Sequence, residues 1–169
     1  MTILSRVPPV ALLLLTLSLS ACGPFDVSVN DRTVFTPRPL FKDYNIPDPA
    51  LASCVGDAIA SQLATSASEL RSLVCRDAGV SSVAGLETFT ALDRIDLRDN
   101  AIQDIGPLAA VSAVQTLLLS DNDIVNPVPL YRMTALAQLE LEGNGRLLCP
   151  DRAALIGVEV LGLPRHCGR

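Results

Sequence analysis

Five cysteines and a single histidine are the residues of this chain best suited to covalent or metal chemistry. The cysteines are Cys22, Cys54, Cys75, Cys149 and Cys167, and the histidine is His166. A zinc site needs clustered sulfur or nitrogen ligands, which this set does not supply. The sequence also has no G-x-S-x-G, no H-E-x-x-H, no P-loop and no Rossmann glycine pattern. We therefore predict neither an enzyme nor a bound cofactor.

Three aspartates recur at a spacing of 22 residues: Asp77, Asp99 and Asp121. If they stack on neighbouring strands they lie about 5 Å apart. Together with Asp104 or Asp123 they would then offer the carboxylate oxygens that Ca²⁺ prefers. Asp is also a common turn residue, so a structural role explains the same recurrence. We favour the structural role and keep calcium as an alternative hypothesis.

The same 22-residue period governs asparagines and apolar residues across the chain. Asn100, Asn122 and Asn144 follow it. One complete unit contains Leu92, Ile95, Leu97, Asn100, Ile102 and Ile105. About four units follow one another, at 70–91, 92–113, 114–135 and 136–157. A fixed period of this length indicates a repeat architecture in which each unit needs its neighbours to bury its apolar face.

Each unit contains an alternating core such as Ile95-Asp96-Leu97, which predicts a short strand with its apolar side chains inside. The asparagines stand where the chain leaves the strand. Their buried amides are expected to satisfy backbone groups of neighbouring units and so to form a structural ladder. The return segment is interrupted by Gly106 and Pro107, which favours a 3₁₀ turn over an α-helix.

The pattern L-x-x-L-x-L-x-x-N-x-L resembles that of leucine-rich repeat proteins. The unit length and the I-x-D-I-x-P-L return resemble the short-repeat bacterial class, described as SDS22-like or internalin-like. This resemblance implies an α/β solenoid with one parallel strand per repeat, 3₁₀ or turn returns, a helical N-terminal cap and a disulfide-closed C-terminal cap. It also implies a module that binds a protein or a peptide on its strand face.

The N-terminal cap is predicted from Asp48-Pro49, a helix start with Asp as N-cap and Pro in the first position. An amphipathic helix over about 49–64 would cover the first repeat. It carries Cys54, while Cys75 takes the inward position that Leu97 holds one repeat later. A helix lying over the first coil would bring the two sulfurs together.

The C-terminal cap is predicted from a short helix that opens at Cys149 and runs to about residue 156. An irregular last strand is expected over 158–161, followed by Cys167. A Cys149–Cys167 disulfide would close this end. The two pairs use every cysteine except Cys22, and disulfides of this kind are typical of exported proteins.

Residues 1–21 contain Arg6 followed by the apolar run 10–19, which is typical of a secretory signal. The run ends in Leu19-Ser20-Ala21-Cys22, which resembles the bacterial lipobox. That resemblance implies a lipid on Cys22, and Gly23 after it favours the outer membrane. An ordinary signal peptide is the alternative. Residues 22–47 contain four prolines and predict a tether, or short strands along the solenoid, before a domain at 48–169.

The formal charge of −5 argues against nucleic acid and against direct docking to anionic lipid, so membrane contact is expected through the anchor only. The partner would be an unknown protein or peptide bound by a monomeric domain. The strand-face residues proposed for it are Arg94, Asp96, Arg98, Leu118 and Glu140. An exposed Leu118 beside Arg98 resembles an interface hot spot. The alternatives are a structural subunit of an envelope complex and an enzyme without a recognisable motif.

Overall fold

The computed structural model describes residues 27–29, 32–35 and 39–168. The predicted signal sequence and the predicted lipidation site at Cys22 lie outside the described residues. The chain divides into two units, with the second running from Leu40 to Arg169. In the first unit, β1 (Val27–Val29) and β2 (Arg32–Phe35) pair with each other as an antiparallel hairpin. The hairpin falls within the segment expected to be a tether.

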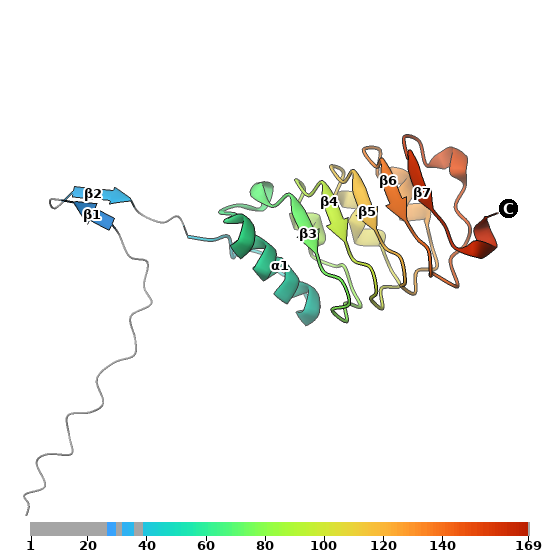
Figure 1. Ribbon diagram of the computed structural model, residues 1–169, viewed down its shortest axis with the longest axis horizontal. Coiled ribbons are helices and arrows are strands. Elements are labelled where there is room, and N and C mark those ends of the chain that lie inside the picture. The colour runs from blue at the N-terminus through green and yellow to red at the C-terminus, as the bar shows by residue number, and fades with distance from the viewer. Residues whose placement is uncertain (1–26, 30–31, 36–38, 169) are drawn as a thin grey trace, which may run out of the picture. The chain divides into compact units, whose positions relative to one another are not determined.

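The second unit is built on a five-stranded parallel sheet whose strands follow one another in chain order. Figure 1 shows the strands side by side with the short helical turns behind them. The strands are β3 (Ser72–Val74), β4 (Arg94–Asp96), β5 (Thr116–Leu118), β6 (Gln138–Glu140) and β7 (Val160–Gly162). From β3 to β7, each residue pairs with the one 22 positions later, as in Leu73 with Ile95. The predicted last strand therefore lies in regular register and not as an irregular end.

The return segments are short 3₁₀ turns, as the sequence predicts. They cover Leu86–Thr88, Gly106–Ala110 and Val128–Arg132. Pro107 stands in the first turn of the second segment, where its missing N–H costs nothing. The inward residues fill the space between the strands and these turns, and Leu97, Leu119 and Leu141 are completely buried.

A ladder of asparagine side chains joins successive coils. The Asn122 amide nitrogen donates to the carbonyls of Leu97 and Leu119 at 2.9 and 3.1 Å, and its oxygen accepts from the Ile102 N–H at 3.0 Å. Asn100 and Asn144 make the corresponding bonds one repeat to either side. Each amide therefore satisfies backbone groups of its own coil and of the preceding one.

Helix α1 (Pro49–Gln62) covers the first coil. It ends two residues before the expected boundary because Leu63 adopts a left-handed conformation with φ of 53°. The Cys54–Cys75 disulfide ties the helix to the end of β3. The helix and the first repeat are thus linked covalently, in the arrangement that the sequence predicts.

Residues 40–47, which were expected to belong to the tether, pack against the same cap. The ring of Phe41 lies 6.1 Å from that of Phe89, and the ring of Tyr44 lies 5.5 Å from it. Gly85, at φ of 95°, has no room for a side chain because the backbone of Asn45 lies against it. These contacts place the segment within the folded unit and not in a free linker.

The C-terminal end is closed by the Cys149–Cys167 disulfide, as predicted. The helix expected from Cys149 to about residue 156 is instead a single 3₁₀ turn, Arg152–Ala154. Asp151 begins this turn by accepting a hydrogen bond from the Ala153 N–H at 2.9 Å. His166 lies beside the disulfide, with its Nε2 atom 2.9 Å from the Leu147 carbonyl.

Asp48 joins the start of the helix to the first coil, at a point after β3. One carboxylate oxygen accepts from the N–H groups of Ala50 and Leu51, and the other accepts from Ser81 and from the Ser82 N–H. Burial raises the pKa of Asp48, but the hydrogen bonds outweigh burial and lower the pKa from 3.8 to about 2.

We predict that Asp48→Asn lowers the free energy of unfolding by about 2 kcal/mol at neutral pH, because an amide NH₂ cannot accept from Ser81 and Ser82. A lowered folded-state pKa stabilises the protein above the unfolded value and loses that effect as pH falls. The gap between the two proteins should therefore narrow from pH 3.8 towards about pH 2 in urea unfolding curves. A constant gap would contradict the prediction. The exposed Asp43→Asn serves as control.

Candidate interaction surface

The parallel register arranges the outward side chains of the sheet in rows. The middle row consists of Val74, Asp96, Leu118, Glu140 and Gly162. We call the outward side of β3–β7, with Arg76, Arg98, Ser120 and Glu142 just beyond the strands, the strand face. Because every row is set by the same 22-residue offset, side chains from non-adjacent strands can reach each other across one intervening strand.

Leu118 is buried, contrary to the prediction that it forms an exposed apolar centre. Only 2% of its surface is exposed, and Asp96 beside it is 4% exposed. The side chains of Leu118 and Asp96 therefore point away from the core of the solenoid and are nevertheless covered by neighbouring side chains. Since a buried Leu118 offers almost no surface to a partner, its proposed role as a hot spot is wrong for this conformation.

Arg98 spans the centre of the strand face. Its guanidinium binds Asp96 through two bonds of 2.9 and 2.7 Å, and its third nitrogen lies 3.5 Å from Glu140. It thereby links β4 to β6 across β5, where Leu118 is located. This bridge accounts for the burial of a leucine on the outward side of the sheet.

Asp96 remains ionised in this bridge. Burial raises the pKa of its carboxyl, but the hydrogen bonds and the charge of Arg98, aided by Arg76, hold the pKa below its ordinary value. The same partnership raises the pKa of the Arg98 guanidinium. Arg98, Asp96 and Glu140 thus lie together as predicted, but they bind one another, so a partner would have to compete for them.

The groups that are free to meet a partner lie around this bridge. Arg94 is exposed, and no ion pair joins it to another described residue. Glu142 is exposed and accepts one hydrogen bond, from the Ser120 hydroxyl at 3.0 Å. Val74 has 58% of its surface exposed. The alternation in the sequence already placed Val74 outward, but only the structure shows that no neighbour covers it.

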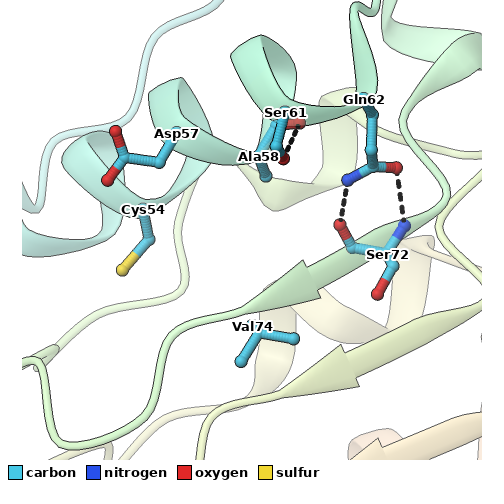
Figure 2. A pocket seen from close by; sticks show the side chains of 7 residues that line it. All are labelled: Cys54, Asp57, Ala58, Ser61, Gln62, Ser72 and Val74. Atoms are coloured by element: carbon cyan, nitrogen blue, oxygen red, sulfur yellow. Dashed lines mark hydrogen bonds between the residues drawn. The ribbon is translucent and has the colours of Figure 1, made fainter.

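A groove of about 550 Å³ lies beside Val74, between α1 and β3. It is lined by Cys54, Asp57, Ala58, Ser61, Gln62, Ser72 and Val74. Figure 2 shows the Gln62 side chain reaching β3, where its amide nitrogen donates to the Ser72 carbonyl at 2.6 Å and its oxygen accepts from the Ser72 N–H at 3.2 Å. No sequence motif points to this groove.

The three periodic aspartates have a conformational role. Asp77, Asp99 and Asp121 have φ of 48°, 59° and 57°, and Gly143 takes the next repeat position at 77°. Asp tolerates this left-handed region better than most residues. Asp99 also pairs with Arg76 at 3.4 Å. The described part of the chain does not gather the three carboxylates into a possible metal site.

Cys149, His166 and Cys167 are the one close group of possible metal ligands among the described residues. Their two sulfurs form the C-terminal disulfide. A disulfide sulfur is not a thiolate, and the thiolate is the metal ligand. The group therefore fits a structural staple, and the two disulfides indicate an exported protein, since they persist in oxidising compartments.

No protein-family model and no curated protein matches the chain. Among solved structures, an internalin (inlF) from Listeria monocytogenes is similar over 71% of this chain, with a TM-score of 0.57 and 26% identity. The in-register parallel sheet, the 3₁₀ returns and this likeness agree. The domain is a leucine-rich repeat solenoid. The chain spans 36% of the length of that internalin.

Two further structures of the same organism match less well. An internalin C2 (inlC2) has a TM-score of 0.36 and 18% identity, with 69% of this chain and 82% of its own chain covered. The functional domain of InlJ, which includes a cysteine ladder, has a TM-score of 0.38 and 16% identity, with 66% and 35% covered. At these scores they add nothing to the argument. The part of the chain that the structure describes contains no helix with the length and hydropathy of a membrane span.

We predict that Leu118→Ala lowers the free energy of unfolding by about 2–4 kcal/mol, because it removes buried methyl groups under the Arg98 bridge. Val74→Ala, at the same height on β3 but exposed, should change it by less than about 1 kcal/mol. Chemical denaturation of both variants tests the difference. If both substitutions changed the free energy of unfolding by the same small amount, Leu118 would not be buried as described.

Proposed function

We propose that this protein is a lipid-anchored interaction module of the cell envelope that binds a protein or peptide on its strand face. The observation that carries the proposal is the build of that face. The fixed bridge between Arg98, Asp96 and Glu140 is surrounded by three exposed residues, Val74, Arg94 and Glu142. Neither Arg94 nor Glu142 forms an ion pair with another described residue. Rigid, preorganised surfaces of this type bind with little ordering cost.

The size of the face limits the partner. Five strands at the usual spacing span only about 20 Å, which suits a short extended segment or a loop. The free charges differ across the sheet, with Arg94 on the β4 side and Glu142 beyond β6. A partner that offers an acidic group over β4 and a basic group near β6 would complement them, and such complementarity favours specificity.

The anchor belongs to the same proposal. The signal sequence at 1–21 and the lipobox-like Leu19 to Cys22 support lipidation of Cys22, and the two disulfides support export. Residues 22–39 would connect the lipid to the unit that begins at Leu40. Gly23 after the cysteine favours the outer membrane. The function proposed is thus presentation of a small binding face at a membrane surface.

Cys22→Ser is expected to abolish incorporation of a labelled fatty acid, because the lipid is attached through sulfur. The variant should accumulate as precursor or appear in the soluble fraction after detergent extraction. Labelling and partitioning of wild type and variant measure this directly. A Ser20→Thr variant is the control and should stay membrane-bound. Fatty-acid labelling of Cys22→Ser as strong as that of wild type would contradict the anchor.

The strand face is tested by reversing its two free charges with Arg94→Glu and Glu142→Arg. Net charge and the central bridge are preserved, so folding should be unaffected, as the melting temperature would show. We expect the wild-type protein to capture a partner in crosslinking pull-downs from its own membranes, and the double variant to lose it. Mass spectrometry identifies the captured proteins. The control pair, Arg132→Glu with Asp43→Arg, lies off the face and should retain the partner. Retention of every partner by the face variant would mean that binding occurs elsewhere.

A further inference from the structure

The groove between α1 and β3 has properties that the strand-face proposal does not use. The Gln62–Ser72 hydrogen bonds hold the helix to β3 near the start of that strand, and the Cys54–Cys75 disulfide holds it just beyond the other end. The helix cannot move away from the strand without breaking one of these links. The groove is therefore preformed, and its volume of about 550 Å³ lies in the range of ligand-binding pockets.

The two walls of the groove differ in chemistry. On the strand side, Val74 presents an apolar side chain that is 58% exposed. On the helix side, Ala58 continues this apolar surface and Asp57 adds a carboxylate (Figure 2). Asp57 is exposed, and no ion pair joins it to another described residue. An apolar strip that leads to a single carboxylate is complementary to a long side chain with a cationic end.

The surroundings favour a cation further. None of the lining residues is basic, and the last turn of α1 contains no basic residue. Arg76, the next outward residue after Val74, is held by Asp96 and Asp99 at 4.0 and 3.4 Å. Arg76 is therefore engaged away from Asp57.

We propose that this groove receives a lysine or arginine side chain from an extended segment of a protein partner. The aliphatic part would lie along Val74 and Ala58, as such side chains do on apolar surfaces. The cation would bind the Asp57 carboxylate through a charge-assisted hydrogen bond. Flanking residues of the segment would fill the remaining volume. The site shares only Val74 with the strand-face residues proposed above, and either proposal can fail without the other.

The experiment is an NMR titration of the isotope-labelled full protein with the capped pentapeptide Gly-Thr-Lys-Thr-Gly. Versions with norleucine or glutamate in place of lysine are the matched probes. We expect the lysine peptide to shift the amide signals of Ala58 and Val74. Asp57→Asn should weaken its binding by about tenfold, since it removes a charged acceptor. The same charge change at the far end of the sheet, Glu159→Gln, should leave binding unchanged.

A second variant tests the apolar wall. Val74→Lys places a cationic side chain in the groove and should abolish binding of the peptide, while Val74→Thr keeps the shape and should retain most of it. Asp57, Val74 and Glu159 are all exposed, and melting temperatures of the four variants verify folding. The strand-face pair Arg94→Glu and Glu142→Arg should bind the lysine peptide normally, which separates the two proposals.

Three results would overturn the inference. The first is absence of shifts at Ala58 and Val74 up to about 10 mM lysine peptide. The second is equal affinity for the lysine and norleucine peptides, or equal affinity of wild type and Asp57→Asn. The third is binding of n-butylammonium as tight as that of the peptide, because this would make the groove a site for small amines and not for a protein segment.

Discussion

The structure depends on the asparagine that follows each of β4, β5 and β6. A chain that turns sharply after three strand residues leaves backbone groups without ladder partners, and a buried unpaired group is costly. The amide nitrogen of Asn122 donates hydrogen bonds to carbonyls of its own coil and of the preceding one. Its amide oxygen accepts a hydrogen bond from the Ile102 N–H. A hydrophobic side chain would fill the same volume but could bind none of these groups. The amide therefore fixes both the turn and the distance to the neighbouring coil.

This constraint also builds the strand face. Because the ladder holds coils in the same register, Asp96, Leu118 and Glu140 lie abreast on three neighbouring strands. Arg98 can then bind residues on either side of Leu118. The buried carboxylate of Asp96 needs a cation, and the guanidinium of Arg98 is that cation. The aliphatic part of an arginine can also cover a neighbouring apolar residue, here Leu118. The centre of the face is consequently closed, and recognition is left to its margins.

The repeat period predicts the strands and the 3₁₀ returns. The resemblance to leucine-rich repeats implies the parallel order of the strands, and the two predicted caps place the disulfides. The strand pattern of Thr116–Leu118 gives the direction of the Leu118 side chain. It does not show that Arg98, just after the preceding strand, reaches across Leu118, so the burial of Leu118 was not predicted. Residues 40–47 contain the irregular, proline-bearing composition of a linker. Their packing depends on aromatic contacts with Phe89 and on the close approach of the Asn45 backbone to Gly85, and both partners are 40 or more positions away in sequence. The aromatic residues Phe41 and Tyr44 favour packing on the domain, but local composition cannot show which residues they contact.

The groove at the N-terminal cap follows from the way the first strand is covered. A helix has its own backbone groups internally bonded, so it cannot continue the hydrogen-bond ladder of β3. Only a long polar side chain can imitate a strand, and Gln62 does so at the start of β3, where it bonds to the backbone of Arg71 and Ser72. Further along, the disulfide keeps the helix close but contributes no polar contact to Val74. An opening beside Val74 is therefore built into this kind of cap, and Asp57 on its helical wall determines which side chains it favours.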